Sequence, residues 1–318
     1  MFSFCFYGGY VLSLRQQTMR KRTTNRAEAE GRCCNKRKPK EQPQETKRTT
    51  AGDRENICRK QTHQRQITNT TSTDMNYANR RTIRRYTEQD VPQELLKEML
   101  ALASRASNTG NMQTYSVVVT RDKALKEQLA PAHFRQPMVT EAPVVLTFCV
   151  DYNRFSKWCE QREAEPGFDN FQSFTGAAID TALFAQTFAN IAEEHGLGLC
   201  YLGTTTYNAA DIIRVLHLPK RVVPLCTITL GYPAEMPEQQ DRLPIDSILH
   251  KETYHDYAEA DIDRAYREKE ALPSSAGFIA ENKKKTLAQV FAEVRYPKAG
   301  NEQSSEKFLQ VLREQLFL

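Results

Sequence analysis

The sequence lacks any long uncharged apolar stretch. Among its 318 residues, no run approaches the roughly 18 apolar residues that a membrane-spanning helix needs. The longest candidates are residues 1–14 and the segment PVVLTFCV that begins at Pro143. In residues 1–14 no positive charge precedes the apolar run and no small-residue cleavage site follows it, which makes a poor secretory signal. We therefore expect no membrane span and a soluble, cytoplasmic protein.

Motifs for metals, nucleophiles and nucleotides are missing as well. The eight cysteines form no CxxC pair, and the six histidines are scattered, so no cluster has the spacing of a metal site. HExxH, GxSxG and GxxxxGK[ST] motifs are absent, and the GxGxxG reading that starts at Gly196 fails because Tyr201 takes its last position. We expect reduced cysteines, no metal, no catalytic triad and no Rossmann or P-loop nucleotide site.

Positive charge is concentrated in the N-terminal part of the chain. Residues 1–74 hold 16 of the 44 Lys and Arg but only 7 of the 39 Asp and Glu, so the remainder has 28 against 32. Large apolar residues are scarce in 15–74, which leaves little with which to form a core. We expect 1–74 to be a disordered leader, or the result of a start assigned upstream of Met75. A basic arm that binds nucleic acid is the alternative that we favour less.

From Met75 onward, hydrophobic periodicity predicts alternating helices and strands. Apolar residues at helical spacing predict helices over 91–106, 176–194 and 209–218. Short β-branched or apolar runs predict strands over 115–120, 142–150, 197–203 and 222–233. Their alternation predicts a layered α/β arrangement. A last apolar stripe, in an arm from about residue 260, predicts a helix that packs on the body or on a partner subunit, through Phe308, Leu309, Leu312 and Leu316.

Two polar segments flank the first predicted helix. RRTIRRY, residues 80–86, places four arginines in six positions around a threonine, and guanidinium groups with a hydroxyl suit a phosphate dianion. SNTGNMQ, residues 107–113, carries side-chain amides that can both donate and accept, as the ring edge or ribityl chain of a flavin requires. Taken singly, each also has an ordinary interpretation, as a solvated basic segment and as a polar turn.

Four motifs in this order resemble the FMN-dependent nitroreductase family. They are RRTIRRY from Arg80, ASNTGNMQ from Ala106, CYLGTT from Cys200 and RLPIDSILHKETY from Arg242. The resemblance covers about 75–257 and looks closest to the NADPH-dependent branch of oxygen-insensitive nitroreductases and flavin reductases. It implies an α+β fold, a three-layer α/β/α sandwich with a mainly antiparallel central sheet and with FMN at the interface of a homodimer. The C-terminal arm would then embrace the partner.

The same resemblance implies which side chains hold the flavin. The FMN phosphate would be held by Arg80, Arg81, Thr82, Arg84 and Arg242. The ribityl chain and ring would be contacted by Asn108, Asn111, Gln113 and Gln136. The isoalloxazine would be approached by Tyr201, Leu202, Gly203 and Thr204. Two positions depart from the family pattern, because Gln240 stands where a lysine is frequent and Thr204 where a second glycine is more usual.

The implied activity is that of an FMN-dependent NAD(P)H oxidoreductase. Hydride would pass from NADPH or NADH to FMN and then to a small-molecule acceptor, a nitroaromatic, a quinone or a flavin, by a ping-pong mechanism; no catalytic side chain is named. Lys283, Lys284 and Lys285 are a candidate site for the 2′-phosphate of NADPH, or a solvated charge run. The alternative function is a non-catalytic protein of the same fold that binds or sequesters FMN.

Overall fold

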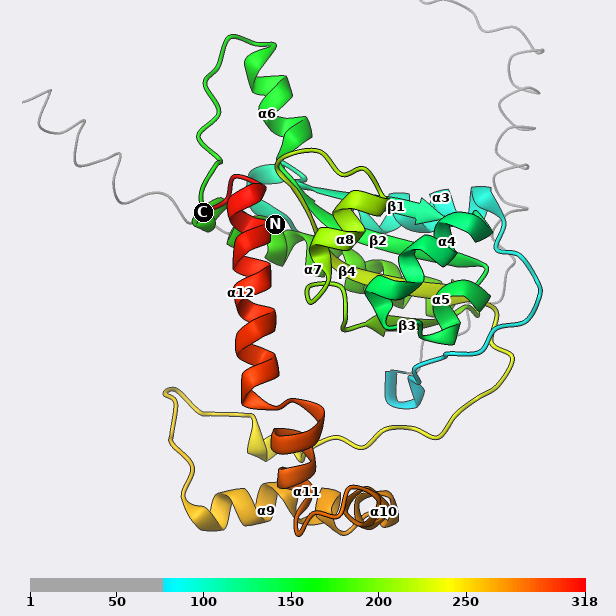
Figure 1. The fold of residues 1–318 in the computed structure, drawn as a ribbon, viewed down its shortest axis with the longest axis vertical. Helices are drawn as coiled ribbons and strands as arrows, with labels where there is room; N and C mark the ends of the chain where they lie inside the picture. The colour runs from blue at the N-terminus through cyan, green and yellow to red at the C-terminus, as the bar shows by residue number, and fades with distance from the viewer. Residues whose placement is uncertain (1–76) are drawn as a thin grey trace, which may run out of the picture. The chain divides into compact units, whose positions relative to one another are not determined.

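The computed structural model describes residues 77–318, so the predictions for the leader lie outside the described residues. At its centre is one antiparallel sheet with the strand order β1-β2-β4-β3 (Figure 1). The strands are β1 Tyr115–Thr120, β2 Val144–Asp151, β3 Gly198–Leu202 and β4 Val222–Gly231. All four lie where the β-branched and apolar runs predict them.

Helices surround this sheet and continue beyond it. The α-helices are α3 Gln93–Ala103, α4 Lys123–Leu129, α5 Pro137–Glu141, α6 Asn153–Glu160, α7 Phe171–Glu194, α8 Ala209–Val215, α9 Glu259–Glu270, α10 Pro273–Glu281, α11 Leu287–Gln289 and α12 Lys298–Glu314. Short helical turns are η1 Tyr77–Asn79, η2 Thr109–Asn111, η3 Ala130–His133, η4 Ile245–Ser247 and η5 Val290–Arg295. The predicted helices correspond to α3, α7 and α8. α7 starts five residues earlier than expected, after Asn170, whose side chain accepts a hydrogen bond from the Ser173 backbone N–H.

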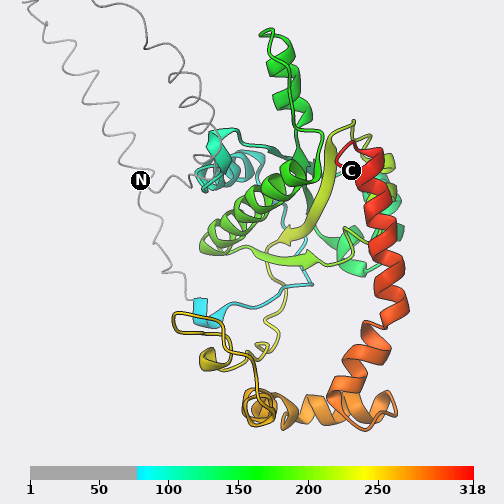
Figure 2. The same cartoon turned by 90° about the vertical axis from the view of Figure 1, so that its left-hand side faces the viewer.

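One face of the sheet is covered by α7, which contacts all four strands and also α3 (Figure 2). Phe184 and Phe188 of α7 pack against Phe148 of β2, with ring centroids 5.4 and 5.7 Å apart. Each of these phenylalanines is at least 96% buried, and full burial of such a side chain contributes about 1.5–3 kcal/mol. Because this aromatic layer buries α7 and β2, both elements have the apolar runs from which they were predicted.

The opposite face is covered by α4, η3, α5 and α8. Leu129, Val139 and Ile212 from these elements pack on Cys200 and Leu202 of β3. The alternate residues of β3, Leu199 and Tyr201, belong to the core under α7, as the two-residue period of a strand requires. The predicted three-layer α/β/α sandwich with an antiparallel sheet is therefore confirmed.

The C-terminal arm returns to the body of its own chain. α12 contacts α8, and Val311, Leu312 and Phe317 join a core with Phe174 of α7. Of the predicted stripe, Leu316 is 40% exposed, because it lies beyond the end of α12 with a left-handed φ of 68°. Figures 1 and 2 both show α9, α10 and α11 set apart from the sheet. Within residues 77–318, no helix combines the length and the hydropathy needed to cross a membrane.

Candidate functional site

The arginine segment runs beside the edge strand β3. The Ile83 N–H donates to the Leu199 carbonyl at 3.0 Å, and a Cβ at Gly198 would lie 2.6 Å from the Ile83 side chain. Glycine is therefore required where the segment meets the strand. Farther along, the Tyr86 hydroxyl lies 2.7 Å from the Thr229 hydroxyl of β4. These contacts fix the backbone from which the arginines project.

The charges of this segment are balanced only in part. Arg80 Nε lies 3.2 Å from Glu193 Oε1, at the end of α7, and burial raises the pKa of Glu193 although Arg80 opposes the rise. Arg81 donates to the Asn79 carbonyl at 2.8 Å. Arg84 is exposed, and its guanidinium lies against the buried Cys200 thiol, whose pKa burial raises. The segment thus presents guanidinium groups next to β3, and such groups suit the binding of an anion.

At its C-terminal end, β3 enters a loop of different character. Gly203 is exposed, and a Cβ there would meet nothing within 4 Å. Thr204 turns inward and its hydroxyl lies 2.8 Å from His133 Nδ1. Gln136 Nε2 donates to the His133 carbonyl at 3.1 Å. The structure therefore brings the predicted residues Gln136 and Thr204 together through His133, a residue that sequence reasoning missed.

The amide loop after α3 is held by another residue that sequence reasoning missed. Both Asp180 carboxylate oxygens accept the Thr109 N–H, at 3.0 and 2.9 Å, and Asp180 Oδ1 accepts the Thr109 hydroxyl at 3.1 Å. Asp180 is only 2% exposed, and burial raises its pKa. One acidic residue within a predicted apolar helix was the available signal, because a buried carboxylate needs such partners.

Within this loop, the predicted side chains bond to one another. Asn108 Oδ1 accepts the Gln113 N–H at 3.2 Å, and Gln113 Nε2 donates to Asn111 Oδ1 at 3.1 Å. Asn111 and Gln113 have left-handed φ values of 55° and 54°, a conformation that costs free energy in residues other than glycine. Asn108, Asn111 and Gln113 therefore form one preorganised group.

The two groups of predicted residues lie at different positions along α7. Glu193 pairs with Arg80 of the arginine segment. Asp180, thirteen residues earlier in the same helix, binds Thr109 of the amide loop. At 1.5 Å per residue, these two positions are separated by about 20 Å. A single chain therefore places Asn108, Asn111 and Gln113 far from Arg80 along this helix.

Arg242 lies in the segment that follows the sheet. Three residues earlier, Gln239 donates a hydrogen bond to the Ala78 carbonyl, which brings this segment beside the start of the arginine segment. The Arg242 side chain is exposed and donates to the Asp241 carbonyl at 2.7 Å. Of the lysine cluster, Lys284 pairs with Glu293 at 2.8 Å, so it is already engaged by a carboxylate.

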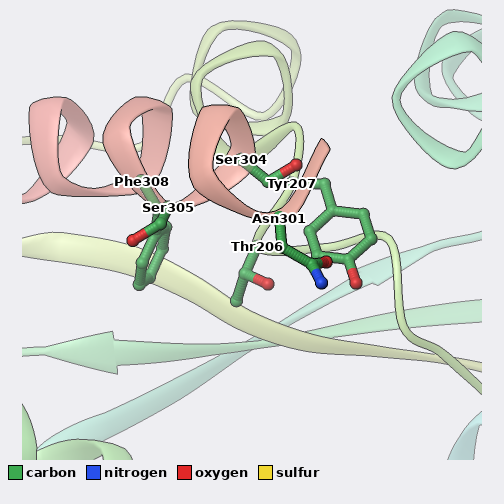
Figure 3. A pocket seen from close by; sticks show the side chains of 6 residues that line it. All are labelled: Thr206, Tyr207, Asn301, Ser304, Ser305 and Phe308. Carbon is green, nitrogen blue, oxygen red and sulfur yellow. The ribbon is translucent and has the colours of Figure 1, made fainter. Parts of the chain in front are cut away.

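A pocket of about 210 Å³ opens between α12 and the loop after β3 (Figure 3). It is lined by Thr206, Tyr207, Asn301, Ser304, Ser305 and Phe308. These side chains carry no charge and include none of the predicted flavin residues. Within residues 77–318, no group of three or more His, Cys, Asp or Glu could hold a metal ion.

Comparisons with known proteins cover this same region. A model described as the nitroreductase family matches residues 77–232. The FMN reductase (NAD(P)H) of Bacillus subtilis is 33% identical over 176 residues, which are 55% of this chain and 71% of that protein. The oxygen-insensitive NADPH nitroreductase of Salmonella typhimurium is 33% identical over 174 residues, with the same two shares.

A solved structure is similar over a longer stretch. The crystal structure of a Bacteroides fragilis protein described as an oxidoreductase is 59% identical, covers 76% of this chain and 98% of that one, and gives a TM-score of 0.75. The residues that the family model matches, 77–232, include both the arginine segment and the loop after β3. With this fold and these relatives, the chain belongs to the nitroreductase family.

Proposed function

We propose that this chain is an FMN-dependent NAD(P)H oxidoreductase that reduces small flat acceptors such as nitroaromatics, quinones or flavins. The observation that carries the proposal is the arrangement along β3, where guanidinium groups lie beside the strand and an exposed glycine loop follows it. The similar proteins named FMN reductase and NADPH nitroreductase support it.

The residues present fit FMN by charge and by space. A phosphate dianion needs cations that are accessible, and Arg84 is exposed next to Arg80, which has a single carboxylate partner at 3.2 Å. A flat ring needs backbone N–H groups that it can approach, and Gly203 leaves open space where a side chain would stand. An unpartnered buried nitrogen, Nε2 of His133, lies behind this loop.

In this proposal, each group of residues has its own task. Arg80, Arg81, Thr82, Arg84 and Arg242 bind the phosphate, and backbone N–H groups of 201–204 face the ring. Bound FMN supplies the redox chemistry, since it can accept a hydride and pass it on. The chain orients the two substrates in turn, and its cations and N–H groups stabilise negative charge on the reduced ring. No side chain is assigned as acid or base.

A homodimer belongs to the same proposal. Asn108, Asn111 and Gln113 are preorganised for polar contacts, yet they lie about 20 Å along α7 from the arginine segment. A second copy of the chain can bring its amide loop to the arginine segment of the first. Two equivalent sites then form across a two-fold axis, as isologous interfaces provide.

The test is the visible absorption of the purified protein during anaerobic additions of NADPH and then NADH. We expect a flavin spectrum that bleaches with at least one donor and returns when a quinone is added. A flavin spectrum that persists with both donors would indicate an FMN-binding protein without this activity. A colourless protein that FMN cannot reconstitute would refute the cofactor itself.

A further inference from the structure

Two segments of the proposed site are joined by a buried hydrogen bond between residues 71 positions apart in the sequence. The Thr204 hydroxyl lies 2.8 Å from His133 Nδ1. Thr204 is 8% exposed and His133 is fully buried. A second link lies close by, because Asn208 Nδ2 donates to the Ala132 carbonyl at 2.7 Å. The loop after β3 is thus attached to the η3–α5 turn at two points.

The chemistry of His133 makes this attachment specific. Burial lowers the pKa of His133 to about 4, so the imidazole is neutral near pH 7 and has one donor and one acceptor nitrogen. Nδ1 serves Thr204, while Nε2 has no protein partner among the described residues. In either tautomer Nδ1 can bond a hydroxyl, which both donates and accepts.

The bond has a consequence for the backbone that faces the flavin. Thr204 directly follows Gly203, so its side chain must be accommodated beside a position where the backbone is open to a ligand. The bond to His133 holds that side chain in the interior, while Gly203 beside it remains exposed. The His133 carbonyl also accepts the Gln136 amide at 3.1 Å. One residue therefore orients both the loop and a predicted flavin contact.

We propose that His133 is a positioning residue, whose imidazole fixes Thr204 so that the 203–204 backbone presents one arrangement to the flavin. The inference rests on the proposed FMN function. It adds a residue that does not touch the cofactor and that acts through the threonine next to Gly203.

The experiment compares matched variants for FMN affinity, flavin absorption spectrum and midpoint potential. Thr204→Val keeps the shape and removes the hydroxyl, whereas Thr204→Ser keeps it. His133→Asn retains a polar atom near the place of Nδ1, whereas His133→Leu retains none. We expect about tenfold weaker FMN binding and a shifted spectrum in Thr204→Val and His133→Leu, because each loses one hydrogen bond. In Thr204→Ser and His133→Asn, which keep a polar group, the FMN affinity should stay within about threefold of wild type.

Two further measurements separate positioning from general stability. The double variant Thr204→Val/His133→Leu should bind FMN no more weakly than either single variant, because both remove the same bond. Thr181→Val deletes another buried hydroxyl, which donates to the Ala177 carbonyl at 2.7 Å. It should lower the thermal midpoint but leave the flavin spectrum and potential unchanged.

The outcomes that would overturn the inference are distinct from failure of the proposed function. A wild-type protein that binds no FMN refutes the function and the inference together. A wild type that binds FMN, with Thr204→Val equal to it in affinity, spectrum and potential, refutes the inference alone. If His133→Leu does not fold, the Thr204→Val and Thr204→Ser pair decides the question.

Discussion

Two carboxylates of α7, Asp180 in the middle of the helix and Glu193 near its C-terminal end, differ in burial and in the groups that they bind. The Glu193 side chain is 16% exposed and pairs with Arg80 at 3.2 Å, beside Arg84 and Arg85, which are exposed. Asp180 is 2% exposed and accepts hydrogen bonds from the backbone N–H and hydroxyl of Thr109. The exposed arginines remain available to a ligand, whereas the buried Asp180 holds the amide loop in one conformation.

This difference predicts different costs of removal. The Arg80–Glu193 pair adds little net stability, because burial disfavours the Glu193 charge more than Arg80 favours it. Loss of a buried acceptor leaves its donors without partners, and each such group costs about 1–3 kcal/mol. Substitutions at the amide loop should therefore mainly lower the stability of the protein. Substitutions in the arginine segment should mainly change its affinity for the ligand.

The largest expected effect is at Asp180. Asp180→Ala should lower the free energy of unfolding by about 3 kcal/mol, because the Thr109 N–H and hydroxyl lose their acceptor. Urea unfolding followed by circular dichroism measures this. Asp211→Ala, which removes an exposed α8 carboxylate paired with Arg214 at 3.1 Å, is the control and should change stability by less than about 0.5 kcal/mol. Equal effects of the two variants would mean that the buried carboxylate contributes no more stability than an exposed one.

The second effect concerns His133, which is fully buried against Thr204 in the loop after β3. Since the pKa of His133 is about 4 in the folded protein and near 6.5 when unfolded, the unfolded chain binds the proton more tightly. The stability present above pH 6.5 is lost as pH falls toward 4, by about 2 kcal/mol between pH 7 and pH 4.5. In His133→Asn, the free energy of unfolding should fall less between pH 7 and pH 4.5 than in wild type. The same pH dependence in both proteins would contradict a lowered pKa of His133.

The third effect concerns affinity alone. Arg84→Ala should weaken FMN binding about tenfold, as for one charge-assisted hydrogen bond, and leave the thermal midpoint near that of wild type because Arg84 is exposed. Fluorescence quenching of FMN during titration of the apoprotein measures the affinity. Arg214→Ala, which removes another exposed arginine, is the matched control. Unchanged affinity in Arg84→Ala would exclude Arg84 from the phosphate site.

The smallest effect is at Glu193. Glu193→Gln removes the carboxylate partner of Arg80, and should cost at most about 1 kcal/mol of stability. The freed guanidinium should tighten FMN binding by about two- to threefold, since less charge competes with the phosphate. The same titration at low and high salt measures this gain, which added salt should reduce. Weaker binding would mean that Glu193 supports the site instead of competing for Arg80.

Local patterns in the sequence were enough for the layers of the fold. The β-branched run 115–120, the apolar run 142–150 and the Ala-rich run 176–194 each report burial through their own periodicity. The short helices α4 and α5 and the polar α9 escaped prediction, because few residues or a mostly polar surface give a weak periodic signal. Tertiary packing fixed them.

The contacts that organise the candidate site were beyond local patterns. Asp180 meets Thr109, and His133 meets Thr204, each across 71 positions, and neither pair belongs to a motif of fixed spacing. Phe134 and Arg135 have left-handed φ values of 53°, which ordinary residues seldom signal in a sequence. The resemblance supplied the predicted flavin contacts, and the structure shows which buried residues bond to them.

In the proposed homodimer, the separation of the amide loop from the arginine segment along α7 would link cofactor binding to assembly. If each flavin contacts two chains, saturation with FMN and dimerisation become one linked equilibrium, and each strengthens the other by the same factor. Dilution of the protein should then release flavin at constant total FMN, and excess FMN should shift the chain toward the dimer. In such a dimer, protein concentration would control flavin occupancy.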